Sequence, residues 1–183
     1  MVIEKYTKEW VNQFSQIEEI LKQNLSKFIK IEHVGSTAII GMCAKPIIDI
    51  IIVIESMDDF DIIKNELNFI GYFHNGNQGI EGREVFNREK IIYNKTLDEI
   101  NHHLYVCTKD NAEYKRHIFF RNYLNKNENK KHEYYKIKME IIEKIGNENR
   151  KEYVEIKETE YSWFFENVIR KAEEFENMER EMF

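Results

Sequence analysis

Hydrophobic residues recur along the chain with two different periods, and their alternation predicts a mixed α/β fold. Steps of three and four residues, typical of amphipathic helices, cover residues 6–27 and 58–70. Compact apolar runs, typical of strands, cover residues 27–34 and 46–55. The second run is almost continuous isoleucine, which favours a strand buried on both faces of a sheet.

The middle of the chain predicts a loop followed by two strands. Residues 71–82 hold four of the seven glycines, a composition typical of loops. Apolar and β-branched residues then favour strands over residues 83–93 and 101–108. We expect these two strands to pair antiparallel.

From Asp110 onward the pattern predicts three helices. The second covers residues 129–145 and stops at Gly146, and the third covers residues 149–175. The composition therefore changes near Thr108. We expect one domain over residues 1–183, with a mixed α/β core in residues 1–108 and a helical part in residues 109–183.

Composition and charge narrow the class of protein. Of the 183 residues, 42% are hydrophobic and 33% are charged, which indicates a folded chain rather than a disordered one. The net charge of −6 argues against a general nucleic-acid binder. Cys43 and Cys107 lack CxxC spacing, and no apolar run is long enough to cross a bilayer. We therefore expect a cytoplasmic protein with reduced thiols and no membrane association.

The segment between the first two predicted strands holds the candidate chemistry. The first strand ends at Gly35-Ser36, Lys45 follows in the loop, and Asp49 lies at the start of the next strand. Glycine permits close approach to a ligand, and the serine hydroxyl with nearby amides binds phosphate oxygens. A carboxylate together with phosphate oxygens suits Mg²⁺. The alternative is an ordinary tight turn in which Asp49 caps the chain or pairs with Lys45.

The run HVGSTAIIGMCAKPIIDI, residues 33–50, resembles the signature of the GrpB-like family, which belongs to the nucleotidyltransferase fold superfamily. Further matches extend the resemblance over residues 6–160; they are Tyr6, Trp10, Phe14, Gly82-Arg83, Phe86, His102-His103-Leu104, Phe120-Arg121, Tyr123-Leu124, Tyr134, Lys138, Tyr153 and Lys157. The resemblance implies a small mixed β-sheet flanked by helices, with a helical C-terminal part. It makes Ser36 a phosphate contact and Asp49 a metal ligand, and we expect the neighbouring Gly35 and Thr37 to contact phosphate as well.

The carboxylates expected for two-metal phosphoryl chemistry are incomplete. Such chemistry needs several carboxylates around the ions, and the strand neighbour of Asp49 on the same face is Ile51. His102 and His103 lie on a strand where a further ligand is expected, but they face opposite sides, so only one can join Asp49. A histidine in a strand is more often structural than a ligand. We expect at most a single Mg²⁺, completed by water and phosphate.

Four basic residues beside aromatic or apolar neighbours are candidates for binding an anionic ligand; they are Arg83, Arg121, Lys138 and Lys157. Arg83 or Arg121 would stabilise developing charge, and the lysines would contact phosphate. We expect Arg83, one histidine and Arg121 to face Gly35, Ser36, Lys45 and Asp49 across a cleft. The alternative is that these basic side chains lie on solvated helix faces.

The aromatic residues of the helical part have several interpretations. Their helical spacing favours a core or a helix–helix seam, and a homodimer surface or a base-stacking platform is the alternative.

Functions of different classes fit these features. The leading hypothesis is a nucleotidyltransferase-like protein that binds a nucleotide or another phosphorylated small molecule and, where active, transfers a nucleotidyl group with Mg²⁺. The alternative is a non-catalytic module that senses a ligand or binds a partner protein. Action on RNA ends is least favoured, because the acidic balance leaves no basic stripe for nucleic acid.

Overall fold

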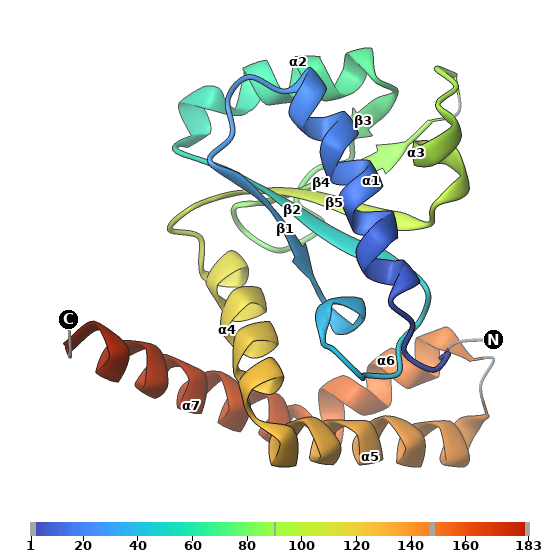
Figure 1. The fold of residues 1–183 in the computed structure, drawn as a ribbon, viewed down its shortest axis with the longest axis vertical. Helices are drawn as coiled ribbons and strands as arrows, with labels where there is room; N and C mark the ends of the chain where they lie inside the picture. The colour runs from blue at the N-terminus through green and yellow to red at the C-terminus, as the bar shows by residue number, and fades with distance from the viewer. Residues whose placement is uncertain (1–2, 90, 147–148, 182–183) are drawn as a thin grey trace.

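The computed structural model describes residues 3–89, 91–146 and 149–181, and it shows a mixed five-stranded sheet (Figure 1). The strands are β1 Lys30–Val34, β2 Ile48–Ile54, β3 Tyr72–His74, β4 Arg83–Arg88 and β5 His102–Thr108. Their order is β1-β2-β5-β4-β3. β2 and β5 are parallel, and all other neighbours are antiparallel, including β4 and β5 as the sequence predicted.

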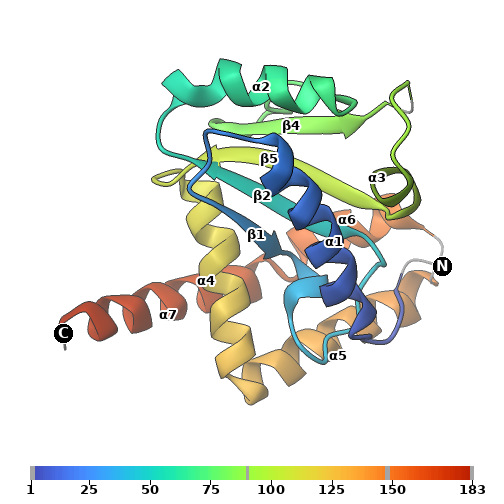
Figure 2. The same cartoon turned by 45° about the horizontal axis from the view of Figure 1, so that its top comes forward.

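Helices cover both faces of the sheet and extend beyond it (Figures 1 and 2). They are α1 Glu9–Asn24, α2 Phe60–Phe69, α3 Lys95–Glu99, α4 Ala112–Lys126, α5 Glu128–Ile145, α6 Arg150–Thr159 and α7 Ser162–Glu181, with short 3₁₀ turns at Ser36–Ala38 (η1) and Met57–Asp59 (η2). The first three α-helices pack on one face, and α4 packs on the other. Fold class and helical C-terminal part are therefore as predicted.

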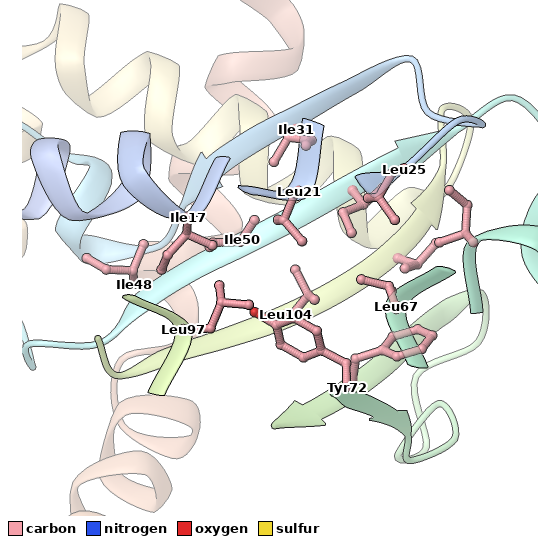
Figure 3. Packing of buried hydrophobic residues seen from close by; sticks show 14 of the residues in the cluster. Ile17, Leu21, Leu25, Ile31, Ile48, Ile50, Leu67, Tyr72, Leu97 and Leu104 are labelled. Atoms are coloured by element: carbon pink, nitrogen blue, oxygen red, sulfur yellow. The ribbon is translucent and has the colours of Figure 1, made fainter. Parts of the chain in front are cut away.

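The central strand β2 is buried on both sides, as its isoleucine run predicted. Ile48, Ile50 and Ile52 belong to the core formed with α1, α2 and α3, in which Figure 3 shows Ile48 and Ile50. Ile51 and Val53 pack on the other face with α4. All five are fully buried. Each such side chain contributes about 1.5–3 kcal/mol relative to leaving it exposed. The same alternation decides which side chains of β2 can reach a site on the α4 side.

A second core joins the helical part to the loop between β1 and β2. Ile39, Met42 and Cys43 of that loop pack with buried apolar residues of the helices, which are Leu124, Tyr134, Ile137, Ile141, Phe164 and Val168. The loop that follows Ser36 is thus held against α5 and α7. Residues about a hundred positions apart in sequence meet there, and the candidate site lies at this junction.

The structure differs from the sequence-based prediction in four places. Tyr72–His74 form strand β3 at the start of the predicted loop 71–82, and the strand predicted over 83–93 ends at Arg88. The five-residue helix α3 was not predicted, and the single helix expected over 149–175 is two helices, α6 and α7. Elements of three to five residues are too short to show a period, so only pairing and packing reveal them.

Within the described residues, no helix combines enough length with enough apolar character to span a membrane.

Candidate functional site

Asp49 and His103 are brought together by the parallel pairing of β2 with β5. The register places Asp49 opposite His103 on one side and opposite Val34 on the other. His103 Nδ1 lies 2.8 Å from Asp49 Oδ1, and because a carboxylate only accepts, the imidazole donates this hydrogen bond. About a quarter of the Asp49 side chain remains exposed, at 27%. The pair is therefore ordered and still accessible.

His102 lies on the opposite face of the sheet and does not join this pair. Its Nε2 is 2.6 Å from the Tyr72 hydroxyl, and its Nδ1 is 2.7 Å from the carbonyl oxygen of Ile100. Burial lowers the pKa of His102, so it is neutral near pH 7. Of the two histidines predicted as metal ligands, only His103 lies beside Asp49, and His102 is held by structural hydrogen bonds.

Gly35 lets the turn after β1 approach the Asp49 carboxylate. Its φ is +72°, a left-handed conformation that glycine adopts without steric cost. A Cβ built on Gly35 would overlap Asp49 Oδ2. Any other residue would therefore both strain the backbone and displace the carboxylate, so glycine is required here by its surroundings.

Ser36 is contacted by two side chains of α5. Lys138 Nζ donates to Ser36 Oγ at 2.8 Å and to the carbonyl oxygen of Cys43 at 2.9 Å. The Tyr134 hydroxyl lies 3.3 Å from Ser36 Oγ, and the Tyr134 ring lies under the Lys138 ammonium at 4.7 Å. Lys138 is only 3% exposed. Burial lowers its pKa to about 8, and nearby Cys43 and Asp49 oppose this shift.

Two cavities meet at Ser36. The smaller has a volume of about 220 Å³, and its polar lining consists of Ser36, Thr37, Lys45, Asp49, His103, Tyr134, Lys138, Tyr153 and Lys157. The larger, of about 730 Å³, shares Ser36, Asp49, Tyr134 and Lys157 with it. Its other walls are the aromatic rings of Phe120 and Phe165 and a polar rim that includes Gly35, Glu81, Glu113, Arg116, His117, Arg121, Glu158 and Glu166.

Thr37 lines the smaller cavity but uses its hydroxyl to hold the turn. Thr37 Oγ1 lies 2.9 Å from His33 Nε2 and 3.4 Å from the carbonyl oxygen of Ile47. The residue is 2% exposed. Its predicted phosphate contact would therefore involve the backbone rather than this hydroxyl.

The predicted arginines are placed differently from the lysines. Arg121 lines the larger cavity, but its Nη1 donates to Glu32 Oε2 and to the carbonyl oxygen of His33, both at 2.7 Å. Burial alone would raise the pKa of Glu32, and the hydrogen bond from Arg121 holds it below its usual value. Arg121 thus ties α4 to β1, with its charge already compensated.

Arg83 lines neither of these two cavities. Its guanidinium stacks over the Tyr105 ring at 4.8 Å, and its buried Nε has no hydrogen-bond partner. The prediction that Arg83 faces Asp49 across a cleft is therefore wrong, because Arg83 lines neither cavity that Asp49 lines. Strand β4 is separated from β2 by β5, so an arginine at its first residue lies too far from the Gly35 turn.

The arrangement of the possible metal-binding side chains decides which metal ions fit this site. Among residues 3–89, 91–146 and 149–181, no group of three or more His, Cys, Asp or Glu side chains is arranged to hold a metal ion. Three glutamates are candidate substitutes for the missing carboxylate beside Asp49. Glu32 pairs with Arg121, Glu84 pairs with His74, and Glu81 lines the larger cavity but not the smaller one. A two-metal centre does not fit. One Mg²⁺ on Asp49 fits only with phosphate and water completing its ligands.

Direct contacts between Ser36 and α5 were not predicted from the sequence. Tyr134 and Lys138 are four residues apart, and residues at this spacing share a helix face. That spacing could have indicated a joint role for the two residues. It could not show which loop this face of α5 contacts, because Ser36 and Lys138 are 102 residues apart.

Comparison with known proteins places the chain among relatives named GrpB. A family model described as GrpB protein matches residues 1–171. The glutamate-rich protein GrpB of Alkalihalophilus pseudofirmus is 34% identical over 150 residues, which cover 81% of this chain and 84% of that protein. YqkA of Bacillus subtilis is 32% identical over 137 residues, which cover 74% of this chain and 38% of YqkA.

Two solved structures resemble this chain to different degrees. The conserved protein GrpB from Enterococcus faecalis superposes with a TM-score of 0.74 at 29% identity, over 92% of this chain and 98% of that one. The structure of Cid1 in complex with the UTP analog UMPNPP has a TM-score of 0.47 at 10% identity, over 66% of this chain and 36% of Cid1.

Proposed function

Given that the chain belongs to the GrpB family, we propose that the two cavities around Ser36 bind a nucleotide or another phosphorylated small molecule. The observation that carries this proposal is the charge balance of the smaller cavity. Three lysines, Lys45, Lys138 and Lys157, line it with a single carboxylate, Asp49. A site with three cations and one anion favours an anionic ligand.

Lys138 supports this interpretation most directly. Its ammonium is buried, and its two hydrogen bonds go to neutral oxygen atoms rather than to a carboxylate. A buried charge without a counter-ion is costly, and a bound phosphate would supply the missing negative charge. The Ser36 hydroxyl, which is half-buried and lines both cavities, adds a hydrogen-bonding group beside it.

The sizes of the cavities suggest how such a ligand is divided between them. Ligand sites in proteins usually have volumes of about 300–1,000 Å³, a range that includes the larger cavity but not the smaller. We assign the anionic group to the smaller cavity and the rest of the molecule to the larger one, against Phe120 and Phe165. If Mg²⁺ takes part, Asp49 would hold it beside the phosphate, where the ion would neutralise charge.

The proposal is tested by thermal unfolding with nucleoside triphosphates, and with inorganic triphosphate, each with and without Mg²⁺. Ligand that binds only the folded state raises the melting temperature, by the equivalent of about 2.7 kcal/mol at a hundred times Kd. We expect Lys157→Met to weaken the shift and Asp49→Asn to remove any dependence on Mg²⁺. Lys144→Met, on the exposed side of α5 beside Glu160, is the matched control and should not change it.

Failure of every phosphorylated compound to raise the melting temperature of the wild type would contradict the proposal. An equal shift in wild type and Lys157→Met would place the ligand elsewhere.

A second candidate function, a non-catalytic ligand sensor, is favoured by the incomplete donor set for metal ions. It predicts that a nucleotide binds with the same affinity in the presence and absence of Mg²⁺ and releases no pyrophosphate. An active transferase instead shows Mg²⁺-dependent pyrophosphate release that Asp49→Asn abolishes. The two candidates therefore separate in one assay.

A further inference from the structure

The contact between Ser36 and Lys138 has the geometry of a nucleophile and its general base. Lys138 Nζ lies 2.8 Å from Ser36 Oγ, within the range that proton transfer requires. The amine also donates to the carbonyl oxygen of Cys43 at 2.9 Å. A neutral amine held by that bond keeps a lone pair, which can accept the proton of the serine hydroxyl.

Burial of Lys138 makes its neutral form accessible near physiological pH, although the charged form still predominates at pH 7. Burial lowers the pKa of Lys138 to about 8, so about a tenth of the protein carries the neutral amine at pH 7 and half carries it near pH 8. The buried Cys43 thiol and the Asp49 carboxylate oppose this shift. The other ionisable groups around the amine are Tyr134, which contacts it, and Lys45, His103, Tyr153 and Lys157, which line the same cavity.

Ser36 is accessible to a reacting molecule. It is half-buried and lines both the smaller and the larger cavity, so a ligand in either can reach its hydroxyl. The Tyr134 hydroxyl, 3.3 Å from Ser36 Oγ, positions the serine from a second side. The lysines that line the smaller cavity indicate that an electrophile bound there carries negative charge.

We propose that Ser36 is a nucleophile activated by Lys138, and that it attacks the phosphorus atom of an anionic phosphate ester or anhydride. The Ser36 Oγ–P bond forms as the P–O bond to the leaving group breaks, with its electron pair on the leaving oxygen. The hydroxyl proton passes to Lys138 Nζ, which can return it to that oxygen. The product is a phosphoryl or nucleotidyl ester of Ser36, and no electron is gained or lost.

This inference goes beyond the proposed function, in which Ser36 only contacts phosphate. It needs neither a metal ion nor a particular nucleotide. A test with a small phosphorus electrophile therefore separates it from the question of which ligand the cavities bind.

The test is the reaction of the folded protein with diisopropyl fluorophosphate, which forms a Ser36 Oγ–P bond and releases fluoride. We expect an adduct on Ser36, located by peptide mass spectrometry and absent in Ser36→Ala. The labelling rate should rise with pH between 6.5 and 9.5, with a midpoint near 8, the pKa of Lys138. Lys138→Met should label at least tenfold more slowly and lose this rise.

Two controls separate activation by Lys138 from general exposure or charge. Ser162 lines the larger cavity, but its hydroxyl donates to the carbonyl oxygen of Thr159 at 3.5 Å, so it should remain unlabelled. Lys144→Met removes an exposed lysine of α5 that pairs with Glu160 outside both cavities, and it should leave the labelling rate and the pH midpoint unchanged. Should Lys138→Met fail to fold, Lys138→Arg keeps the charge but cannot accept a proton in this range and should label equally slowly.

Three results would each overturn the proposal: no adduct on Ser36 in folded wild type at pH 9, equal labelling of Ser36 and Ser162, or wild-type labelling in a folded Lys138 variant. Labelling of Ser36 without any nucleotide-dependent thermal shift would leave this inference standing and count against the proposed function. A thermal shift without labelling would do the reverse.

Discussion

Two cations with little exposure, Arg88 and Lys138, are held in opposite ways in this molecule. The Arg88 side chain is 10% exposed, and its Nε donates to Asp98 Oδ1 at 2.7 Å, where the aspartate side chain is 6% exposed. Lys138 is buried as deeply, yet its hydrogen bonds go to the Ser36 hydroxyl and the Cys43 carbonyl. The arginine is neutralised within the fold, whereas the lysine is not.

This difference in partners indicates that the charge of Arg88 serves the structure, whereas that of Lys138 is available to a ligand. Arg88 also donates to the carbonyl oxygens of Ile70 and Ile92, so it links β4 to the turns around it. Each of its three guanidinium nitrogens therefore donates a hydrogen bond within the protein. Lys138 instead lines a cavity. We propose that it binds an anionic ligand there and exchanges a proton with Ser36.

Breaking the Arg88–Asp98 pair should have the largest effect on stability. Asp98→Asn leaves the Arg88 charge buried without a counter-ion, and we expect a loss of about 3–5 kcal/mol in the free energy of unfolding. Urea denaturation of wild type and variant measures it. A loss below about 1 kcal/mol would mean that the carbonyl contacts alone hold Arg88.

The pH dependence of stability should show the cost of burying Lys138. Its pKa is lowered from 10.5 to about 8, so the folded state binds fewer protons than the unfolded state between these values. Stability contributed by this group therefore rises with pH across that window, by at most about 3 kcal/mol. The difference between wild type and Lys138→Met, measured by urea denaturation from pH 7 to 9.5, isolates it from cysteine and tyrosine titrations common to both. A difference that stays constant with pH would show that Lys138 is not desolvated.

Replacing Lys138 should cost little stability at neutral pH, in contrast to Asp98→Asn. Lys138→Met keeps the length of the side chain and removes a desolvated charge, so we expect the variant to be as stable as the wild type or more stable by about 1 kcal/mol. In the same variant ligand binding should weaken, and labelling of Ser36 should be at least tenfold slower. A strongly destabilised Lys138→Met would instead assign the lysine to the structure.

An exposed ion pair on α7 should contribute least to stability among the charged groups compared here. Arg170 Nη1 lies 2.6 Å from Glu174 Oε1 on α7, and both side chains are more than half exposed. We expect Glu174→Gln to change the free energy of unfolding by less than about 0.5 kcal/mol, because solvent screens such pairs. Denaturation under the conditions used for Asp98→Asn compares the two pairs directly, and similar losses would remove burial as the explanation.

The elements that a sequence pattern can predict here are the long ones. The strands around Ile31 and Ile50, and helices α1, α2, α4 and α5, follow from hydrophobic periods that span several turns or a full strand. Strand β3 and helix α3 did not follow, because each is shorter than one reliable period. The break between α6 and α7 at Glu160-Tyr161 was also missed, since neither glycine nor proline marks it.

The part of the candidate site that the sequence predicted is the part built from residues close together in the chain. Gly35, Ser36 and Asp49 lie close together because a strand, a turn and the neighbouring strand bring them there, which is a local arrangement. Arg83 was placed wrongly because its position depends on strand order. Of the basic residues named as candidates for an anionic ligand, Lys138 lines the smaller cavity and Lys157 lines both, which spacing alone could not show.

The sequence by itself determined the fold class, the two-sided burial of β2, and the rule that only one of His102 and His103 can join Asp49, since these depend on local periodicity and strand alternation. Tertiary structure alone decided that the histidine is His103, through the register of β5 on β2. It also decided that Lys138 meets Ser36, through the packing of α5 against the loop after β1. Such contacts join residues far apart in the chain, and the free energy that selects them belongs to the assembled core rather than to any single segment.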